Sequence, residues 1–416
     1  MKNRQRVVVT GMGAVSSLGI GTSTLWSAMM SGQSGIAHLQ AIDASPYKVR
    51  IGAEVKDDDL SLALKSAAIR KSDRTLDLAT LASHEALTSA GLIHEGVEPE
   101  LRNVAVVFGS GVGSQHSLHE ATTRFATLGV KGVRPTSVPR CMANAISSRI
   151  SIRYRFTGAN FVIISACTSA TNAIGTAFRM IRDGYADCVL SGGSEAIFSP
   201  DVYAGWDALG VMSRNPQPQQ ACRPFDTTRD GCVLGEGAGA LFIESMEHAQ
   251  QRGAAIRGEI IGYGESSDAT HITRPNPQGQ SLAMNAALTD AGVEPHEVGY
   301  INAHGTATPS NDASESTAIR MTMGSHASTT PVGANKSFLG HTLGASGALE
   351  SIVTLMGLEH RTVPANLNLD EQDPACDVRL VGRAPMTIES PVAIKNSFGF
   401  GGGNGVLVFR RWEQGN

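Results

Sequence analysis

Cys167 is the residue with the clearest potential for covalent chemistry, and it lies in the segment FVIISACTSATNAIG. The apolar run before it predicts a buried strand, and the Ala-rich run after it predicts a helix. A thiol at this junction meets unpaired backbone N–H groups and the helix dipole, which favour the nucleophilic thiolate. A strand-to-helix turn also exposes an attacking atom at the edge of a sheet. The alternative is a buried, inert cysteine that only packs, which is the role we expect for the other five cysteines.

Two histidines occur in similar settings. His304 lies in YINAHGTATPSND and His341 in NKSFLGHTLGASGA, each just after a predicted strand. One such histidine could be a structural hydrogen-bonding group. Two histidines and a cysteine at strand ends, where α/β folds gather their sites, predict one shared site.

Charged and Gly-rich segments lie close to these histidines in the sequence. Lys336, Asp312 and Glu315 could form an ion network that holds one imidazole, with a purely structural salt bridge as the alternative. The stretch NSFGFGGGNG, residues 396–405, could direct backbone N–H groups at a ligand or at a developing oxyanion.

The elements that must position these residues alternate between β-branched runs and Ala-rich helical runs, which indicates an α/β fold. The predicted strands are 6–10, 104–108, 161–165, 188–192, 240–244, 259–263, 298–303, 332–335, 392–397 and 405–410. The two halves resemble each other, so we expect a duplication with one half at 1–253 and the other at 254–416. Small residues in the helical segments after Cys167 and His341 predict two central helices buried between sheets. The Pro-rich segment 197–235 is expected to be irregular.

Composition excludes several classes of protein. The chain has 416 residues, 34 Lys+Arg and 38 Asp+Glu, and a net charge of −4, which disfavours nucleic-acid binding. No apolar run approaches the roughly 18 residues of a membrane span. Six cysteines without a C-x-x-C pair indicate a reducing compartment, and we expect a cytoplasmic protein. A charged fraction of only 17% suggests self-association.

Motifs for bound cofactors are weak. GSGVGS (109–114) and TGMGAVSSLG (10–19) both depart from the dinucleotide-binding pattern. His116 and His119 share a helical face but have no third ligand nearby in sequence, so a solvated face is favoured over zinc. We therefore expect neither a metal nor a cofactor.

The segments SACTS, NAHGTATPSND, NKSFLGHTLGASGALES and NSFGFGG, in this order, resemble the signature of β-ketoacyl-[acyl-carrier-protein] synthases of the elongating, type II kind. VVVTGMGAVSSLG, ACRPFDTTRDGCVLGEGAG and VPANLNLD also match, so the resemblance covers essentially the whole chain. It implies the thiolase fold, five α-β-α-β-α layers built from two similar halves. It also implies an acyltransferase of fatty acid biosynthesis that condenses an acyl group with malonyl-[acyl-carrier protein], releasing carbon dioxide and 3-oxoacyl-[acyl-carrier protein].

The resemblance assigns roles to individual positions of this chain. Cys167 would take the acyl group, and the N–H groups of Cys167 and Phe400 would form the oxyanion hole. His304 and His341 would bind the malonyl thioester carbonyl and stabilise the enolate. Lys336, held by Glu315, with Asp312 as a candidate second holder, would orient His304. Two histidines favour this family over relatives with His and Asn, and over thiolases, which use a second Cys.

The resemblance also implies substrate contacts and partners. Thr306 and Thr308 would bind the phosphopantetheine arm, which arrives on the carrier protein, while Phe400 would gate an acyl pocket lined by Val112 and Trp206. The expected partners are acyl carrier protein, with a candidate basic face, and a second copy in a homodimer, with a heterodimer as the alternative. That basic face comprises Lys65, Arg70, Lys71 and Arg74.

The chain departs from the family pattern at Gly403, where Thr is usual, and at Thr168–Ser169. These departures leave open a specialised ketosynthase of a polyketide or polyene pathway that works with a chain-length-factor partner. A non-catalytic chain-length factor is disfavoured by the nucleophile, and a nucleotide-dependent oxidoreductase by the weak glycine motifs.

Overall fold

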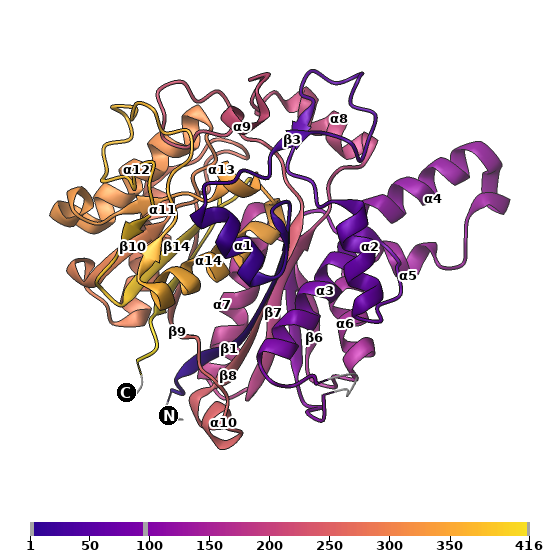
Figure 1. Ribbon diagram of the computed structural model, residues 1–416, viewed down its shortest axis with the longest axis horizontal. Helices are drawn as coiled ribbons and strands as arrows, with labels where there is room; N and C mark the ends of the chain where they lie inside the picture. Colours follow the sequence, from indigo (N-terminus) through magenta and orange to yellow (C-terminus); the bar gives the residue numbers. More distant parts are fainter. Residues whose placement is uncertain (1–3, 95–98, 414–416) are drawn as a thin grey trace.

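The computed structural model describes residues 4–94 and 99–413, and in that part of the chain eleven strands form one mixed sheet (Figure 1). The main strand order is β11-β10-β14-β15-β9-β1-β8-β7-β5-β6. The strands are β1 Val7–Ser16, β5 Ala105–Gly109, β6 Asn160–Ile163, β7 Cys188–Glu195, β8 Gly237–Ser245, β9 Gly258–Ser267, β10 Val298–Asn302, β11 Val332–Gly333, β14 Val392–Phe398 and β15 Gly403–Arg410. Each of the ten predicted strands coincides with one of them, so these predictions are confirmed.

The same pattern of strands occurs twice along this path. From β1, the order β8, β7, β5, β6 runs outward with two antiparallel and then two parallel pairings. From β9, the order β15, β14, β10, β11 repeats those directions. The two sets join where Val7–Val9 pair with residues 258–260. Most of these strands are buried along their whole length, which explains their continuous apolar runs.

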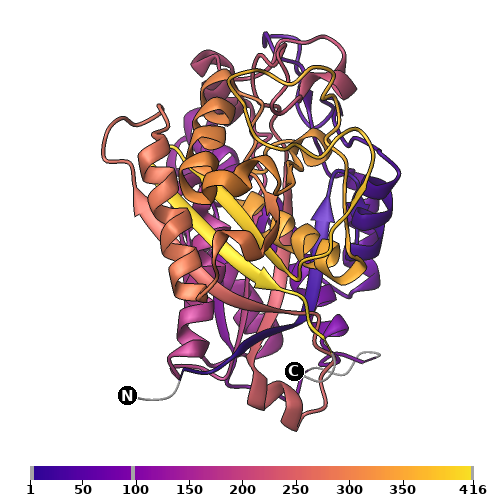
Figure 2. The same ribbon diagram turned by 90° about the vertical axis from the view of Figure 1, so that its left-hand side faces the viewer.

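Helices complete five layers, which agree with the expected α-β-α-β-α fold and follow one another across Figure 1, while Figure 2 looks onto the outermost helices of the second strand set. α3 (Arg74–Ser89) and α6 (Ala145–Tyr154) cover the outer face of the first strand set, and α11 (Pro277–Ala291) covers that of the second. α12 (Pro309–Met323) packs against α11 and shares an apolar cluster with the second strand set. α7 (Ser169–Arg182) and α14 (Ser346–His360) fill the layer between the sets and contact strands of both.

Small residues allow the two central helices to approach closely. A Cβ at Gly347 of α14 would lie 2.5 Å from the backbone N of Thr171 in α7. A Cβ at Gly175 would overlap the Tyr263 ring of β9. The prediction of two buried central helices is therefore confirmed: Gly347 allows the backbones of α14 and α7 to touch, and Gly175 leaves room for the Tyr263 ring.

The remaining elements surround this framework. They are β2 Gly19–Ile20, α1 Thr22–Met30, β3 Ala37–His38, β4 Ile51–Gly52, α2 Asp57–Ser66, α4 Gln115–Leu128, α5 Ser137–Cys141, α8 Pro200–Leu209, α9 Pro218–Ala221, α10 Met246–Gln251, α13 Lys336–Leu339, β12 Thr362–Val363 and β13 Met386–Thr387. The segment 197–235, predicted to be irregular, contains two helices, α8 and α9, in which Pro200 and Pro218 occupy the first turn, where proline is tolerated. Within the described ranges, no helix is both long and apolar enough to cross a membrane.

Candidate active site

Cys167 lies on a tight turn between β6 and α7. The turn is a short 3-10 helix, Ala166–Thr168, and α7 starts at Ser169. Ala166 has φ +51°, a left-handed conformation that is strained for a residue with a side chain. The Ser169 hydroxyl accepts from Ser165 N and donates to Ala166 O, which stabilises the turn. The predicted strand–nucleophile–helix arrangement is thus present, and it presents the sulfur to the interior.

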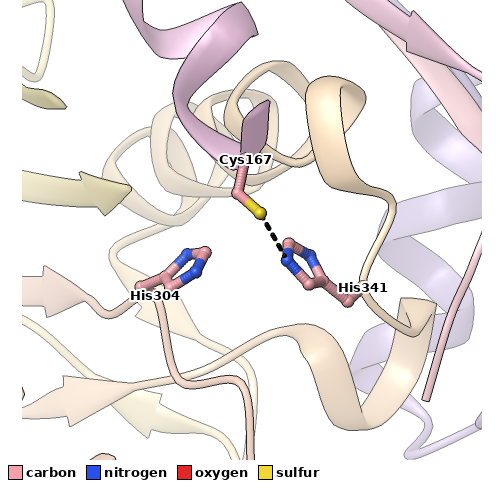
Figure 3. Close-up of side chains that lie close together, drawn as sticks. All are labelled: Cys167, His304 and His341. Carbon is pink, nitrogen blue, oxygen red and sulfur yellow. Dashed lines mark hydrogen bonds between the residues drawn. The ribbon is translucent and has the colours of Figure 1, made fainter. Parts of the chain in front are cut away.

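The cysteine and both histidines meet at one point (Figure 3). The Cys167 Sγ atom and one ring nitrogen of each histidine lie within 4.8 Å of one another. His341 Nε2 is 3.0 Å from Cys167 Sγ, and the His304 and His341 rings are perpendicular with centroids 5.3 Å apart. All three side chains are buried. Residues spread over 174 positions therefore form one compact cluster.

His341 is held by the helix that follows it. Its Nδ1 lies 3.1 Å from the hydroxyl of Ser346, the first residue of α14. A hydroxyl can both donate and accept, so Ser346 can pair with either neutral tautomer of the ring. Nε2 is therefore free either to accept a proton from the thiol or to donate one to a substrate oxygen.

Lys336 and Glu315 hold His304 from two directions. Lys336 Nζ lies 3.3 Å from His304 Nδ1 and donates to the His304 carbonyl at 2.5 Å. An ammonium facing Nδ1 makes this nitrogen an acceptor, so the ring proton resides on Nε2. The Glu315 carboxylate accepts from the backbone N–H groups of His304 and Gly305 at 2.7 and 2.8 Å.

The predicted partner of Lys336 is wrong. Its ammonium pairs with Glu350 of α14 at 2.6 Å, while Glu315 binds only neutral donors around His304. Asp312 accepts from the N–H of Phe225 at 2.9 Å and lies 3.9 Å from Arg229, so it braces a neighbouring loop. The prediction considered only the carboxylates close to His304, whereas the packing of α14 brings Glu350, 14 residues after Lys336, to the ammonium. A glutamate inside the apolar run SGALESIVTLMG was the available signal.

Burial controls the protonation of the cluster. It raises the pKa of the Cys167 thiol to about 11, although Lys336 and the Phe400 N–H oppose this. The expected thiolate is therefore wrong for the resting site, which holds a neutral thiol. Burial, helped by the charge of Lys336, lowers the pKa of His304 and of His341 well below the usual value. Both rings are neutral, as expected, so His341 can accept the thiol proton.

Backbone N–H groups of two segments converge beside the sulfur. The Phe400 N–H points at Cys167 strongly enough to lower the pKa of its thiol. A Cβ at Gly399 would lie 3.3 Å from Cys167 N, so the two backbones are almost in contact. Gly401 and Gly402 turn the chain with φ values of +86° and +77°, which only glycine adopts readily. This geometry can hold an oxyanion between Cys167 N and Phe400 N.

A cavity leads from the surface to the cluster. Its walls include Thr306, Thr308, Trp206 and Phe400, together with the cysteine and both histidines. The rings of Trp206 and Phe400 stack with centroids 5.8 Å apart. Val112 does not line this cavity and instead packs against the apolar cluster that contains Cys167. Cys232, for which the sequence predicts only a packing role, does line the cavity.

A Cys and two His so close together could also bind a metal ion. However, the ammonium beside His304 Nδ1 places a positive charge next to the cluster. Such a charge disfavours a divalent cation and favours an anionic group. The arrangement is better suited to covalent catalysis with a developing negative charge.

Comparison with known proteins defines the class. Residues 4–249 match the family model "Beta-ketoacyl synthase, N-terminal domain", and residues 257–370 match "Beta-ketoacyl synthase, C-terminal domain". The chain therefore belongs to the β-ketoacyl synthase family and is an enzyme of the condensing, acyltransferase type.

Individual relatives cover nearly the whole chain. The 3-oxoacyl-[acyl-carrier-protein] synthase 2 of Coxiella burnetii is 40% identical over 411 residues, 98% of this chain and 99% of that protein. The protein of the same name from Synechocystis sp. is 39% identical and covers 99% of both chains.

Solved structures agree with this relationship. A β-ketoacyl synthase from Burkholderia phymatum superposes with a TM-score of 0.89 at 34% identity, covering 98% of this chain and 100% of that one. The ishigamide ketosynthase/chain length factor gives a TM-score of 0.90 at 32% identity, covering 99% and 100%.

Proposed function

We propose that this enzyme condenses an acyl group with malonyl-[acyl-carrier protein] in fatty acid elongation, giving 3-oxoacyl-[acyl-carrier protein] and carbon dioxide. The observation that carries the proposal is the cluster in which Cys167 Sγ lies 3.0 Å from His341 Nε2 beside a second neutral histidine. The names of the Coxiella and Synechocystis relatives support the substrate class.

In the first half-reaction Cys167 attacks the thioester carbonyl of the acyl-carrier protein. His341 accepts the thiol proton, because its neutral Nε2 lies in hydrogen-bond range of the sulfur. The carbonyl oxygen gains negative charge and binds between Cys167 N and Phe400 N. The C–S bond to the carrier then breaks, and His341 gives the proton to the departing thiolate. The product is an acyl thioester on Cys167.

In the second half-reaction the malonyl group loses carbon dioxide. The electron pair of the broken C–C bond moves to the thioester, forming an enolate whose oxygen binds His304 Nε2–H and His341 Nε2–H. Donors placed where charge develops lower the barrier without an added acid. The enolate carbon attacks the acyl thioester and expels the Cys167 thiolate, which takes a proton from solvent. Each cycle consumes one proton.

In this proposal the enzyme uses no cofactor of its own, because the substrates arrive on the carrier protein. The phosphopantetheine arm of the carrier extends through the cavity past Thr306 and Thr308, whose hydroxyls lie 2.8 Å apart on its wall. Phe400, stacked on Trp206, must move to admit the acyl chain toward Val112. Phe400 thus acts as the gate.

Acyl carrier protein is the macromolecular partner, and we place its docking site at an exposed basic face. Lys65, Arg70 and Lys71 are exposed there, whereas Arg74 is engaged by Glu236 and Asp57. Three arginines beside this face bind carbonyls of residues 67–72: Arg140, Arg149 and Arg153. Arg149 also pairs with Asp77 and Arg140 with Glu120, whereas no carboxylate pairs with Arg153 among the described residues. A positive face suits an acidic partner.

A second copy of the chain is the other proposed partner. α4 and α5 project from the body as an arm (Figure 1), and the arm exposes apolar side chains. They are Leu118, Phe125, Leu128, Val130, Val133, Val138 and Met142. β6 is an edge strand of the sheet. A homodimer would cover both, and light scattering tests its mass.

We further propose a reducing, cytoplasmic location, supported by six unpaired cysteines in the described chain.

Purified protein tests the function directly. We expect it to form 3-oxoacyl-carrier protein from acyl- and malonyl-carrier protein, and Cys167→Ala to abolish condensation while the fold persists. His304→Ala and His341→Ala are expected to reduce malonyl decarboxylation by at least ~10²-fold. Undiminished condensation by Cys167→Ala would refute the proposed nucleophile.

A polyketide or polyene ketosynthase remains the second candidate. Its supporting observation is the similarity to the ishigamide ketosynthase/chain length factor, and to the ketosynthase in a complex with a type II PKS acyl-carrier protein, which has a TM-score of 0.91 at 29% identity. That ketosynthase structure covers 99% of this chain and 100% of its own. Intact-mass analysis of Cys167 loaded from mixed acyl-carrier thioesters separates the two, because only the second predicts polyketide-like or polyene-like chains.

A further inference from the structure

Lys395 is a fully buried lysine that the reaction described above does not use. It lies in the middle of β14, and its relative exposure is 0%. A buried ammonium must be compensated by nearby acceptors. Its Nζ lies 3.0 Å from Glu350 Oε2 and 3.2 Å from Thr171 Oγ1, and it also donates to the Ser397 hydroxyl.

These contacts join the two halves of the site. Thr171 is on α7, four residues after Cys167, and its hydroxyl lies 2.7 Å from that of Ser397 on β14. Glu350 is on α14, four residues after Ser346, which binds His341. Lys395 therefore lies where α7, α14 and β14 meet. α7 follows Cys167, α14 carries the serine that binds His341, and β14 leads into the Gly-rich turn.

Glu350 is shared between two lysines. Its Oε1 pairs with Lys336 at 2.6 Å and its Oε2 with Lys395 at 3.0 Å. With both ammonium groups charged, the buried trio of Lys336, Glu350 and Lys395 carries one net positive charge. Lys336 contacts the His304 ring directly, so the position of the Glu350 carboxylate determines the position of Lys336. Lys395 fixes the other oxygen of that carboxylate.

We propose that Lys395 is a positioning residue for decarboxylation: it anchors Glu350 and, through it, Lys336 and His304, and it supplies the positive charge that favours the enolate. The inference rests on the proposed function and deepens it. Removing the ammonium leaves Glu350 bound to Lys336 alone and reduces the net charge of the trio from +1 to zero.

The charged and titratable groups around Lys395 set the expected pH dependence. They are Glu350 on α14, Lys336 on α13, Glu315 on α12, and the rings of His304 and His341. Burial, with help from Lys336, lowers the pKa of Lys395 to about 8, against the opposing effect of Glu350. The ammonium is therefore present below this pH and is lost as the pH rises through it.

The test is the rate of malonyl-carrier decarboxylation against pH in the wild type and in Lys395→Met, which keeps the length of the side chain. We expect the wild-type rate to fall as the pH rises through about 8. At about pH 7 the Lys395→Met variant should have a kcat at least ~10-fold lower than the wild type and a KM within ~2-fold of it. Its decarboxylation rate should not fall as the pH rises through about 8. Lys395→Arg carries its charge at all accessible pH values. It should therefore decarboxylate faster than the Met variant, and its rate should not fall as the pH rises through about 8.

Ile394→Val is the matched control, because it disturbs the neighbouring buried position of β14 without changing charge. It should lower stability slightly and leave the pH profile unchanged. A Met variant with the wild-type rate and profile would overturn the proposal. So would a Met variant that is slower but keeps the alkaline fall, since this would mean a purely structural role. If Lys395→Arg does not fold, the Met profile decides alone.

A second readout does not depend on activity. NMR titration of histidine-labelled protein, assigned with His304→Asn, should show a higher pKa for His304 in Lys395→Met than in the wild type, because a repelling charge is removed. An unchanged His304 pKa would contradict the proposal. If the wild type decarboxylated no malonyl-carrier protein, the proposed function would fail, and this titration would still decide whether Lys395 acts on His304.

Discussion

Replacing Gly347 by alanine tests the contact that aligns the two halves of the site. The new Cβ would lie 2.5 Å from Thr171 N and 3.2 Å from Ala170 C, and closer still to Thr171 Oγ1. Two of these three atoms belong to the backbone, so a change of side-chain rotamer cannot remove the overlap. Normal contact near 3.4 Å requires α7 and α14 to separate by roughly 1 Å, and such overpacking costs about 1–3 kcal/mol.

The same separation should impair catalysis, because Cys167 precedes α7 and His341 precedes α14. A shift of about 1 Å would lengthen the 3.0 Å Sγ–Nε2 contact, and misplacement of that size can cost ~10²-fold in rate. Chemical unfolding and acylation of Cys167, followed by intact mass, measure the two effects. We expect both stability and the acylation rate to fall.

Gly205→Ala is the control for the glycine itself. Gly205 is an exposed residue of α8, and a Cβ added there would meet no atom within 4 Å, so alanine should raise stability by up to about 1 kcal/mol. If Gly347→Ala matched this control in stability and in acylation rate, the close approach of the central helices would not be what aligns the cysteine with the histidine.

Three further substitutions test other parts of the structure. Burial raises the pKa of Glu195 to about 7, above its unfolded value of about 4.3. Its stabilising contribution is therefore full below about pH 4 and is lost as the pH rises to about 7. Glu195→Gln should flatten the fall in unfolding free energy between about pH 4 and 7, and an unchanged slope would contradict this. Trp206→Ala removes the ring stacked on Phe400 and should shift the chain lengths loaded from mixed acyl-carrier thioesters; an unaltered distribution would exclude Trp206 from the gate. Lys71→Glu should raise the KM for acyl-carrier protein several-fold, leave kcat unchanged and make KM less dependent on salt concentration. An unaffected KM would place the docking face elsewhere.

The sequence alone predicted much of the framework. Buried strands and amphipathic helices are recorded in local periodicity, which is why all ten strands and both central helices were found. Cys167, His304 and His341 were also recognisable, because each follows a strand and precedes a Gly- or Ala-rich turn. The order and direction of the strands bring these turns to one place, as expected for an α/β fold.

The electrostatic details were decided by the tertiary structure. The resemblance and the closeness of Glu315 to His304 led us to pair Lys336 with Glu315, whereas the packing of α14 supplies Glu350 and lets Lys395 share it. The local setting of Cys167 suggested a thiolate, yet burial outweighs the nearby N–H groups and raises the pKa of its thiol to about 11. Periodicity is a property of neighbouring residues, but the pairing of buried charges and the cost of removing water from them depend on which distant elements meet. This is why the sequence could identify the reacting groups, whereas only the tertiary structure could determine their protonation states and ion-pair partners.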